Sequence, residues 1–161
     1  MTITDRRGYE VGEAIPGTPG TPGSVAFAVN KGGSNQANIA DSTFTIVEWS
    51  NELYDRDGRF DANAWTPPAG IVSMSSQCVV TGTWSAGAIL ALAIFKNGTV
   101  LIQGSFRAPS ANVGTVFVSG SDLAGGSDVY DVRIFVDTSS GTSTISGNTA
   151  TAYFCGFWLG P

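Results

Sequence analysis

The stretch Tyr153-Phe154-Cys155-Gly156-Phe157-Trp158-Leu159 decides the fold of this chain of 161 residues. Successive side chains of a β-strand point to opposite faces, so Phe154 and Trp158 would share one face while Phe157 and Leu159 share the other. A strand in a single-chain antiparallel sandwich needs only one apolar face, because its other face meets water. Burying a large apolar side chain stabilises by about 1.5–3 kcal/mol, so we expect the second face to meet another copy of the chain.

Further strands are predicted between Ser24 and this stretch. In Val129–Asp137 every second residue from Tyr130 onward is apolar, which is the pattern of a half-buried strand. Ala88–Phe95, by contrast, is apolar on both faces. The Asn97-Gly98 pair predicts a type I′ hairpin, in which both residues need a positive φ. The expected strands are 25–29, 43–49, 72–80, 88–95, 99–103, 115–119, 129–137 and 150–159.

The spacing of these strands predicts the fold class. Clusters of Gly, Pro, Ser and Asp separate the strands, and no helix longer than one turn is predicted. Eight or more short strands with such turns predict an all-β fold, either an antiparallel sandwich or a jelly roll. Residues 24–161 are therefore expected to form one β domain.

A collagen-like run precedes the β domain. Glycine stands at every third position, as Gly17, Gly20 and Gly23, and Pro19 and Pro22 complete two Gly-Thr-Pro triplets. Only glycine fits at the axis where three polyproline-type chains meet. Two triplets do not form a stable triple helix alone, so the run is either a stiff linker or the short neck of a trimer. We assign residues 1–23 to this neck and to an N-terminal anchor segment.

The charge balance and the apolar runs argue against two classes of partner. Eight Lys and Arg against thirteen Asp and Glu give a net charge of −5, which provides no basic surface for nucleic acid. No apolar run approaches the roughly 18 residues that span a bilayer. No apolar segment follows Arg6 and Arg7, so we expect no export signal. In an unexported chain Cys78 and Cys155 are expected to be reduced thiols, although a disulfide between them stays open.

Several segments match one known pattern in the order in which they occur. They are Val25-Ala26-Phe27-Ala28-Val29, Tyr54-Asp55-Arg56-Asp57-Gly58-Arg59-Phe60, Trp65-Thr66-Pro67-Pro68-Ala69-Gly70, Ala93-Ile94-Phe95-Lys96-Asn97-Gly98 and Phe154-Cys155-Gly156-Phe157-Trp158-Leu159. Together they resemble the trimeric globular heads of the complement C1q and tumour-necrosis-factor family, although Cys155 and Trp158 depart from the usual closing strand. The resemblance covers residues 24–161.

This resemblance implies an architecture and a set of contacts. It implies an antiparallel jelly roll of about ten strands that forms a homotrimer through one sheet and binds ligands on its outer surface. Together with the apolar last strand, it places five residues between the three chains: Val25, Phe27, Tyr153, Phe157 and Leu159.

The sequence offers little catalytic or metal chemistry. Histidine, the commonest general base, is absent, so we expect no enzyme. Asp55, Asp57 and Asp61 lack the spacing of a calcium loop and are typical of a turn between two strands. Asp122 and Asp128 flank two glycines and could hold a cation, but a solvated loop is the simpler interpretation. We therefore expect no metal and no other cofactor.

Three tryptophans are candidates for ligand contact. Trp49, Trp65 and Trp84 could stack on sugar rings if they were exposed, but at least two of them are expected in the core.

A β head that forms trimers, a collagen-like neck and no expected export signal are together typical of a virion protein. We interpret the chain as a homotrimeric fibre or spike protein of a phage or phage-like particle, assembled in the host cytoplasm, where disulfides are rare. Residues 1–23 would bind a capsid or tail protein, and the head would bind a receptor on the host surface, which we take to be a glycan. Two alternatives stay open: a particle decoration or collar protein without a receptor, and an extracellular C1q-like adhesion or signalling module.

Overall fold

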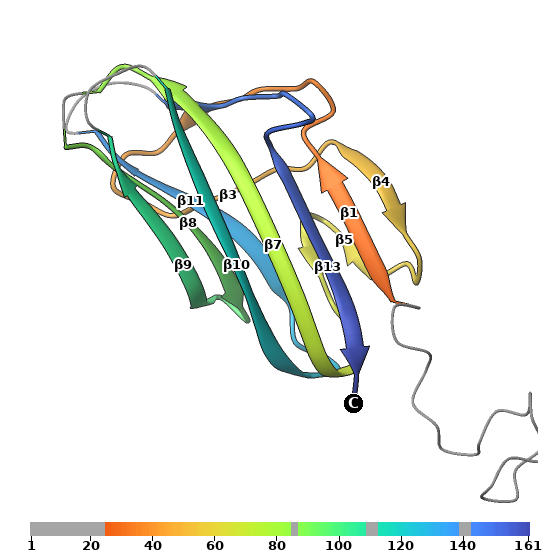
Figure 1. Ribbon diagram of the computed structural model, residues 1–161. Helices are drawn as coiled ribbons and strands as arrows, with labels where there is room; N and C mark the ends of the chain where they lie inside the picture. The colour runs from red at the N-terminus through yellow and green to blue at the C-terminus, as the bar shows by residue number, and fades with distance from the viewer. Residues whose placement is uncertain (1–24, 85–86, 109–112, 139–142) are drawn as a thin grey trace, which may run out of the picture.

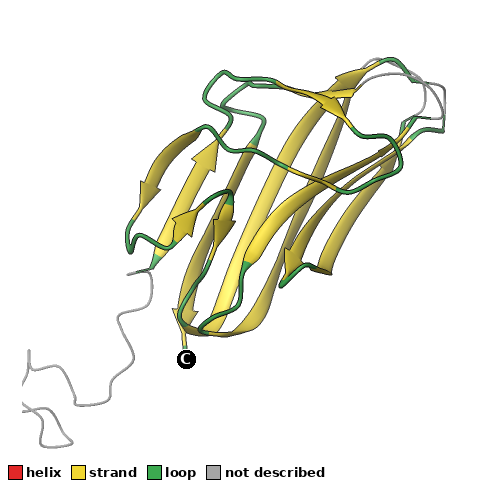
Figure 2. Ribbon diagram, turned by 180° about the vertical axis from the view of Figure 1, so that it is seen from behind, coloured by secondary structure: helices red, strands yellow, loops and turns green. Residues whose placement is uncertain are grey.

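The computed structural model describes residues 25–84, 87–108, 113–138 and 143–161, which form two packed β-sheets (Figure 1). The neck residues Gly17, Pro19, Gly20, Pro22 and Gly23, and the anchor segment before them, lie outside the described residues. Strands and loops make up the described chain, and Figure 2 shows no helix in either layer. None of the described residues belongs to a helix long and apolar enough to span a membrane.

One layer is a seven-stranded sheet that contains the last strand of the chain. Its strands are β1 (Ala26–Asn30), β2 (Gln36–Ile39), β4 (Asn51–Asp55), β7 (Ala69–Gly82), β10 (Val113–Gly125), β12 (Ser143–Ile145) and β13 (Tyr153–Gly160). β13 lies between β1 and β7, β4 pairs with the other side of β1, and β10 pairs with the other side of β7. Every pairing is antiparallel, as predicted.

The other layer is a six-stranded antiparallel sheet. Its strands are β3 (Thr45–Ile46), β5 (Phe60–Asp61), β6 (Ala64–Trp65), β8 (Ile89–Lys96), β9 (Thr99–Arg107) and β11 (Tyr130–Asp137). The order is β5-β6-β11-β8-β9, and β3 also pairs with β11. Between β8 and β9, Asn97 and Gly98 have φ values of 51° and 79°, which confirms the predicted hairpin turn.

Alternate residues of both sheets meet in one core. The predicted parity is confirmed in β7 and β11, whose inward side chains are buried: Val72, Met74, Cys78, Val80, Tyr130, Val132, Ile134 and Val136. Beside them Phe27 packs against the rings of Phe60, Trp65 and Phe154, with centroids 4.8–4.9 Å apart. Gly156 crosses this cluster, where a Cβ atom would lie 2.7 Å from Phe27 Cε1, so no larger residue fits without displacing a ring.

Two expected strands are shorter than predicted. In residues 43–49 only Thr45–Ile46 joins a sheet, because the Gln36 side chain donates to the Ile46 carbonyl and accepts from the Glu48 amide, both at 2.8 Å. Those backbone groups are then not available to a neighbouring strand. The last strand begins at Tyr153 rather than at residue 150, because a turn around Asn148 takes the backbone amides of residues 150–152.

The second apolar face of β8 is covered by the chain itself. Ala91, Ala93 and Phe95 are buried although they lie outside the central core cluster. Phe44 packs edge-on against Phe95 with ring centroids 5.1 Å apart, and the Arg133 guanidinium lies 4.2 Å from the centre of the Phe95 ring. The two-sided apolar pattern of residues 88–95 therefore needs no second copy of the chain.

Candidate functional site

Strand β13 presents apolar side chains on both of its faces, and only one face is covered. On the inward face, 0% of the Phe154 surface and 5% of the Trp158 surface is exposed. On the outward face, Phe157 is 45% exposed and Leu159 is 44% exposed. The predicted division of this strand into two apolar faces is confirmed, and its outward half is apolar surface.

The same apolar surface continues over the neighbouring strands. Ile71 of β7 faces Leu123 of β10, and Ile71 also lies beside Leu159, because it pairs with the next residue, Gly160. We call the exposed apolar residues on this side the apolar sheet face: Tyr54, Ile71, Val113, Phe117, Leu123, Phe157 and Leu159. Ile71, Leu123, Phe157 and Leu159 lie together at one end of this face, whereas the polar residues Ser73, Ser75 and Gln77 of β7 separate them from Phe117 and Val113. An exposed apolar cluster of this kind is typical of an interaction surface.

Sequence reasoning missed most of this face. The signal was present in residues 113–125, where Val113, Phe117 and Leu123 stand at odd positions and the even positions Val116 and Val118 are buried. The period-two pattern that identified residues 129–137 as a strand would have found them.

The predicted contact residues divide into two groups. Val25 and Phe27 lie in the core of their own chain, where Phe27 is fully buried in the aromatic cluster. Its side chain therefore has no surface to offer a neighbour. Tyr153 is half-buried, whereas Phe157 and Leu159 face outward and are exposed.

The two cysteines lie on opposite faces of the sheet. Cys78 is buried in the core, and burial raises the pKa of its thiol to about 12. Cys155 lies on the outward face, 3.2 Å from the Ser75 hydroxyl that it faces across the strand pair. Side chains on opposite faces of one sheet cannot form a disulfide. The structure therefore agrees with two free thiols.

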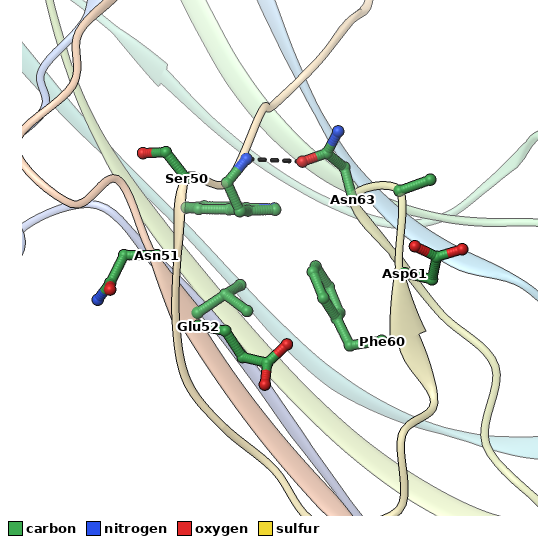
Figure 3. Close-up of a pocket in the computed structure, with 9 residues that line it drawn as sticks. Ser50, Asn51, Glu52, Phe60, Asp61 and Asn63 are labelled. Carbon is green, nitrogen blue, oxygen red and sulfur yellow. Dashed lines mark hydrogen bonds between the residues drawn. The ribbon is translucent and has the colours of Figure 1, made fainter.

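A pocket of about 360 Å³ opens between β4 and the β5 strand (Figure 3). Its apolar wall consists of Val29, Trp49 and Phe60, and polar residues line the rest, among them Asn51, Glu52, Asp61 and Asn63. Figure 3 shows the Phe60 ring directed into the space between the strands and toward Asn63, while Glu52 extends into this space from the opposite strand. Trp49 is thus the tryptophan that can contact a ligand, whereas Trp65 and Trp84 are buried, as expected for at least two of the three.

A buried lysine fixes the segment that carries Trp49. Lys31 is 2% exposed and donates from Nζ to the Glu48 carbonyl at 2.6 Å. Desolvation lowers the pKa of this ammonium. On the other side of Trp49, the Ser50 hydroxyl donates to the Lys31 carbonyl, and the Asn63 side chain accepts from the Trp49 amide at 2.7 Å. The pocket wall is therefore held by hydrogen bonds at three successive residues.

The carboxylates considered as cation ligands bind a lysine of the same chain. Lys96 Nζ lies 2.7 Å from Asp122 Oδ2 and 3.0 Å from Asp128 Oδ2. Hydrogen bonds from the Gly125 amide, the Asn97 side chain and Lys96 lower the pKa of Asp128 to about 2. This cluster closes the end of the sandwich near the β8–β9 hairpin.

The other acidic cluster is a turn, as predicted. Asp55 and Asp61 lie in β4 and β5, and Asp57 lies between these strands. Asp55 accepts from the Phe60 amide at 2.8 Å, and Arg59 pairs with Asp57 at 2.5 Å.

Comparison with known proteins identifies the fold. No protein-family model matches the sequence, and no curated protein matches it. Murine APRIL is similar in structure with a TM-score of 0.62 at 13% identity, over 84% of this chain and 98% of that chain. Eiger TNF from S. frugiperda gives 0.59 at 12% identity, over 84% and 92%. The globular domain of zebrafish complement 1qA gives 0.55 at 12% identity, over 84% and 97%. The chain therefore has the antiparallel jelly-roll fold of the tumour-necrosis-factor and C1q globular heads, as the resemblance in its sequence implied.

Proposed function

We propose that this chain is the homotrimeric head of a virion fibre or spike, in which the apolar sheet face holds three copies together. The observation that carries the proposal is the outward half of β13, where Phe157 and Leu159 remain exposed beside Ile71. A lone chain would leave this patch in water, where it favours aggregation. Three copies is the number that the C1q/TNF-like resemblance implies, and the Gly-Thr-Pro triplets suit three chains that meet in a neck.

The course of the chain supports attachment at one end of the head. β1 begins where β13 ends, because Ala26 pairs with Phe157 (Figure 1). The anchor segment 1–23 therefore joins the head at this end. The opposite end, where β7 finishes and β10 begins, lies at the other end of the sheet from Ala26. Such polarity suits a tip that is carried on a particle and presented to a host surface.

The chemistry supports recognition rather than catalysis. Ser50, the hydroxyl that lines the pocket, donates to the Lys31 carbonyl and so is not paired with a base. The free thiols Cys78 and Cys155 suit assembly in a reducing cytoplasm, which is where a virion would form.

Two experiments test the proposal. Sedimentation velocity of the full chain should give one trimeric species, and a stable soluble monomer at micromolar concentration would overturn the trimer. Particles purified from the source cells should contain the chain, and the purified trimer should bind host cells. Binding to particles without binding to cells would indicate a decoration or collar protein. Secretion of the chain without any particle would indicate an extracellular adhesion module.

A further inference from the structure

We infer that the pocket between β4 and β5 binds a neutral sugar ring. This inference rests on the proposed function, in which the head contacts the host surface, and it names the site and the ligand class for that contact. The pocket has about 360 Å³ of space, which is enough for a monosaccharide unit.

The apolar wall suits the face of a pyranose ring. The indole Nε1 of Trp49 is buried and has no hydrogen-bond partner among the described residues, so the surface that Trp49 offers to the pocket is carbon. The Phe60 ring stacks on Phe27 at 4.9 Å, and the Trp49 ring lies 6.2 Å from that of Phe154. Both pocket rings are therefore backed by core aromatics and need little ordering when a ligand packs on them.

The polar groups of the pocket are a mixture of open donors and acceptors. Asn51 uses its Nδ2 to donate to Asn30 at 3.1 Å, which leaves its Oδ1 open. Asn63 uses its Oδ1 to accept from the Trp49 amide, which leaves its Nδ2 open. Sugar hydroxyls both donate and accept, so they match such a mixture.

Two carboxylates in the pocket favour a neutral sugar over an acidic one. Glu52 and Asp61 line the pocket, and no side-chain hydrogen bond or ion pair joins either carboxylate to another described residue. A free carboxylate accepts well from a sugar hydroxyl. Among the residues that the structure describes, no lysine or arginine lines the pocket, so a phosphorylated or sialylated sugar would meet the negative charge of Glu52 and Asp61.

A cationic ligand fits less well than a neutral sugar. Glu52 and Asp61 are exposed, and exposed ion pairs contribute only about 0–1 kcal/mol. A cation would also leave the open Nδ2 donor of Asn63 without a partner. The combination of a flat aromatic wall, open amides and open carboxylates therefore favours a neutral ring with several hydroxyls.

Binding is measured on the full chain by saturation-transfer NMR and by tryptophan fluorescence. The neutral probes are the methyl glycosides of glucose, galactose, mannose and N-acetylglucosamine, and the charged probes are N-acetylneuraminic acid, glucose 6-phosphate and choline. A bound ligand should change mainly the fluorescence of Trp49, because Trp49 is the tryptophan that lines the pocket, whereas Trp65, Trp84 and Trp158 are buried. At least one neutral glycoside should bind with a Kd on the order of 1 mM, whereas the charged probes should not.

Matched variants locate the site. Trp49→Phe should weaken binding of that glycoside by about tenfold, the loss expected for part of an aromatic contact. Glu52→Gln should weaken it by about two- to fivefold, because the exposed carboxylate contributes at most about 1 kcal/mol. Asp137→Asn, a carboxylate outside the pocket, should leave the affinity unchanged. Circular dichroism and sedimentation confirm that each variant keeps the fold and the assembly of the parent.

Several results would overturn the inference. They are the absence of binding by all four neutral glycosides, a preference for choline or for an acidic sugar, and an affinity that Glu52→Gln and Trp49→Phe leave unchanged. A trimer that is found on particles but binds no sugar would refute the inference that the pocket binds a sugar, and it would leave the proposed function intact. A chain that binds the glycoside but forms no trimer, or occurs on no particle, would remove the proposed function instead.

Discussion

Replacing Phe157 by aspartate should prevent assembly without unfolding the head. Phe157 is 45% exposed in a single chain, so about 90 Å² of the roughly 200 Å² surface of this residue is accessible and could be covered by another copy. At about 25 cal/mol per Å², covering that area contributes about 2 kcal/mol per copy and about 7 kcal/mol per trimer. A loss of this size lowers an assembly constant by about five powers of ten. Three carboxylates brought into an apolar interface would cost several kcal/mol more for each ion.

The assay is sedimentation velocity across a dilution series, with circular dichroism as the test of folding. Phe157→Asp should sediment as a folded monomer at concentrations where the parent is a trimer. The matched control is Ile46→Asp, because Ile46 is 44% exposed but belongs to the opposite sheet. Ile46→Asp should remain a trimer. A trimeric Phe157→Asp, or an Ile46→Asp that dissociates equally, would refute the placement of the interface on the apolar sheet face.

Three further outcomes test the packing, the charges and the thiols. Gly156→Ala should lower the free energy of unfolding by about 1–3 kcal/mol in urea titrations, because its Cβ would lie 2.7 Å from Phe27 Cε1; an unchanged midpoint would contradict the tight crossing. Asp128 has a folded pKa of about 2 against an ordinary 3.8, so the stability that it contributes should be complete above about pH 4 and lost as the pH falls toward 2. The difference in urea midpoint between the parent and Asp128→Asn should follow that course, and a difference that persists at pH 2 would argue against it. Under mild oxidation, mass spectrometry should find no disulfide between Cys78 and Cys155, and a thiol reagent should leave Cys78 unmodified until the protein unfolds.

The parts of the fold that follow from local alternation could be predicted from the sequence. β11 and β7 repeat with period two, β13 is a short run that is apolar on both faces, and the Asn97-Gly98 turn has a specific backbone requirement, so each was found from a short window. The short strands were not found. β5 and β6 contain two residues each, and a stretch that short has no measurable periodicity.

The faces of short strands and the pocket depend on distant contacts. The apolar run that contains Phe27 is compatible with an interface or with a core, and only the neighbouring rings of Phe60 and Phe154 decide in favour of the core. A shift of one residue in register would have reversed the outcome. The pocket wall depends on the Asn63 side chain, which accepts from the Trp49 amide, and on the buried Lys31, which donates to the Glu48 carbonyl. No sequence pattern predicts either hydrogen bond.

The position of β13 between β1 and β7 has a consequence for biosynthesis. The ribosome synthesises β1 first among the described strands. Its partner β13, which pairs with Ala26–Asn30, is synthesised only after every other described strand. Pairing between such distant segments is slow, because closing a long loop costs conformational entropy before any stabilising contact forms. The apolar sheet face is therefore completed last, so a nascent chain cannot associate through Phe157 and Leu159 before the head is whole.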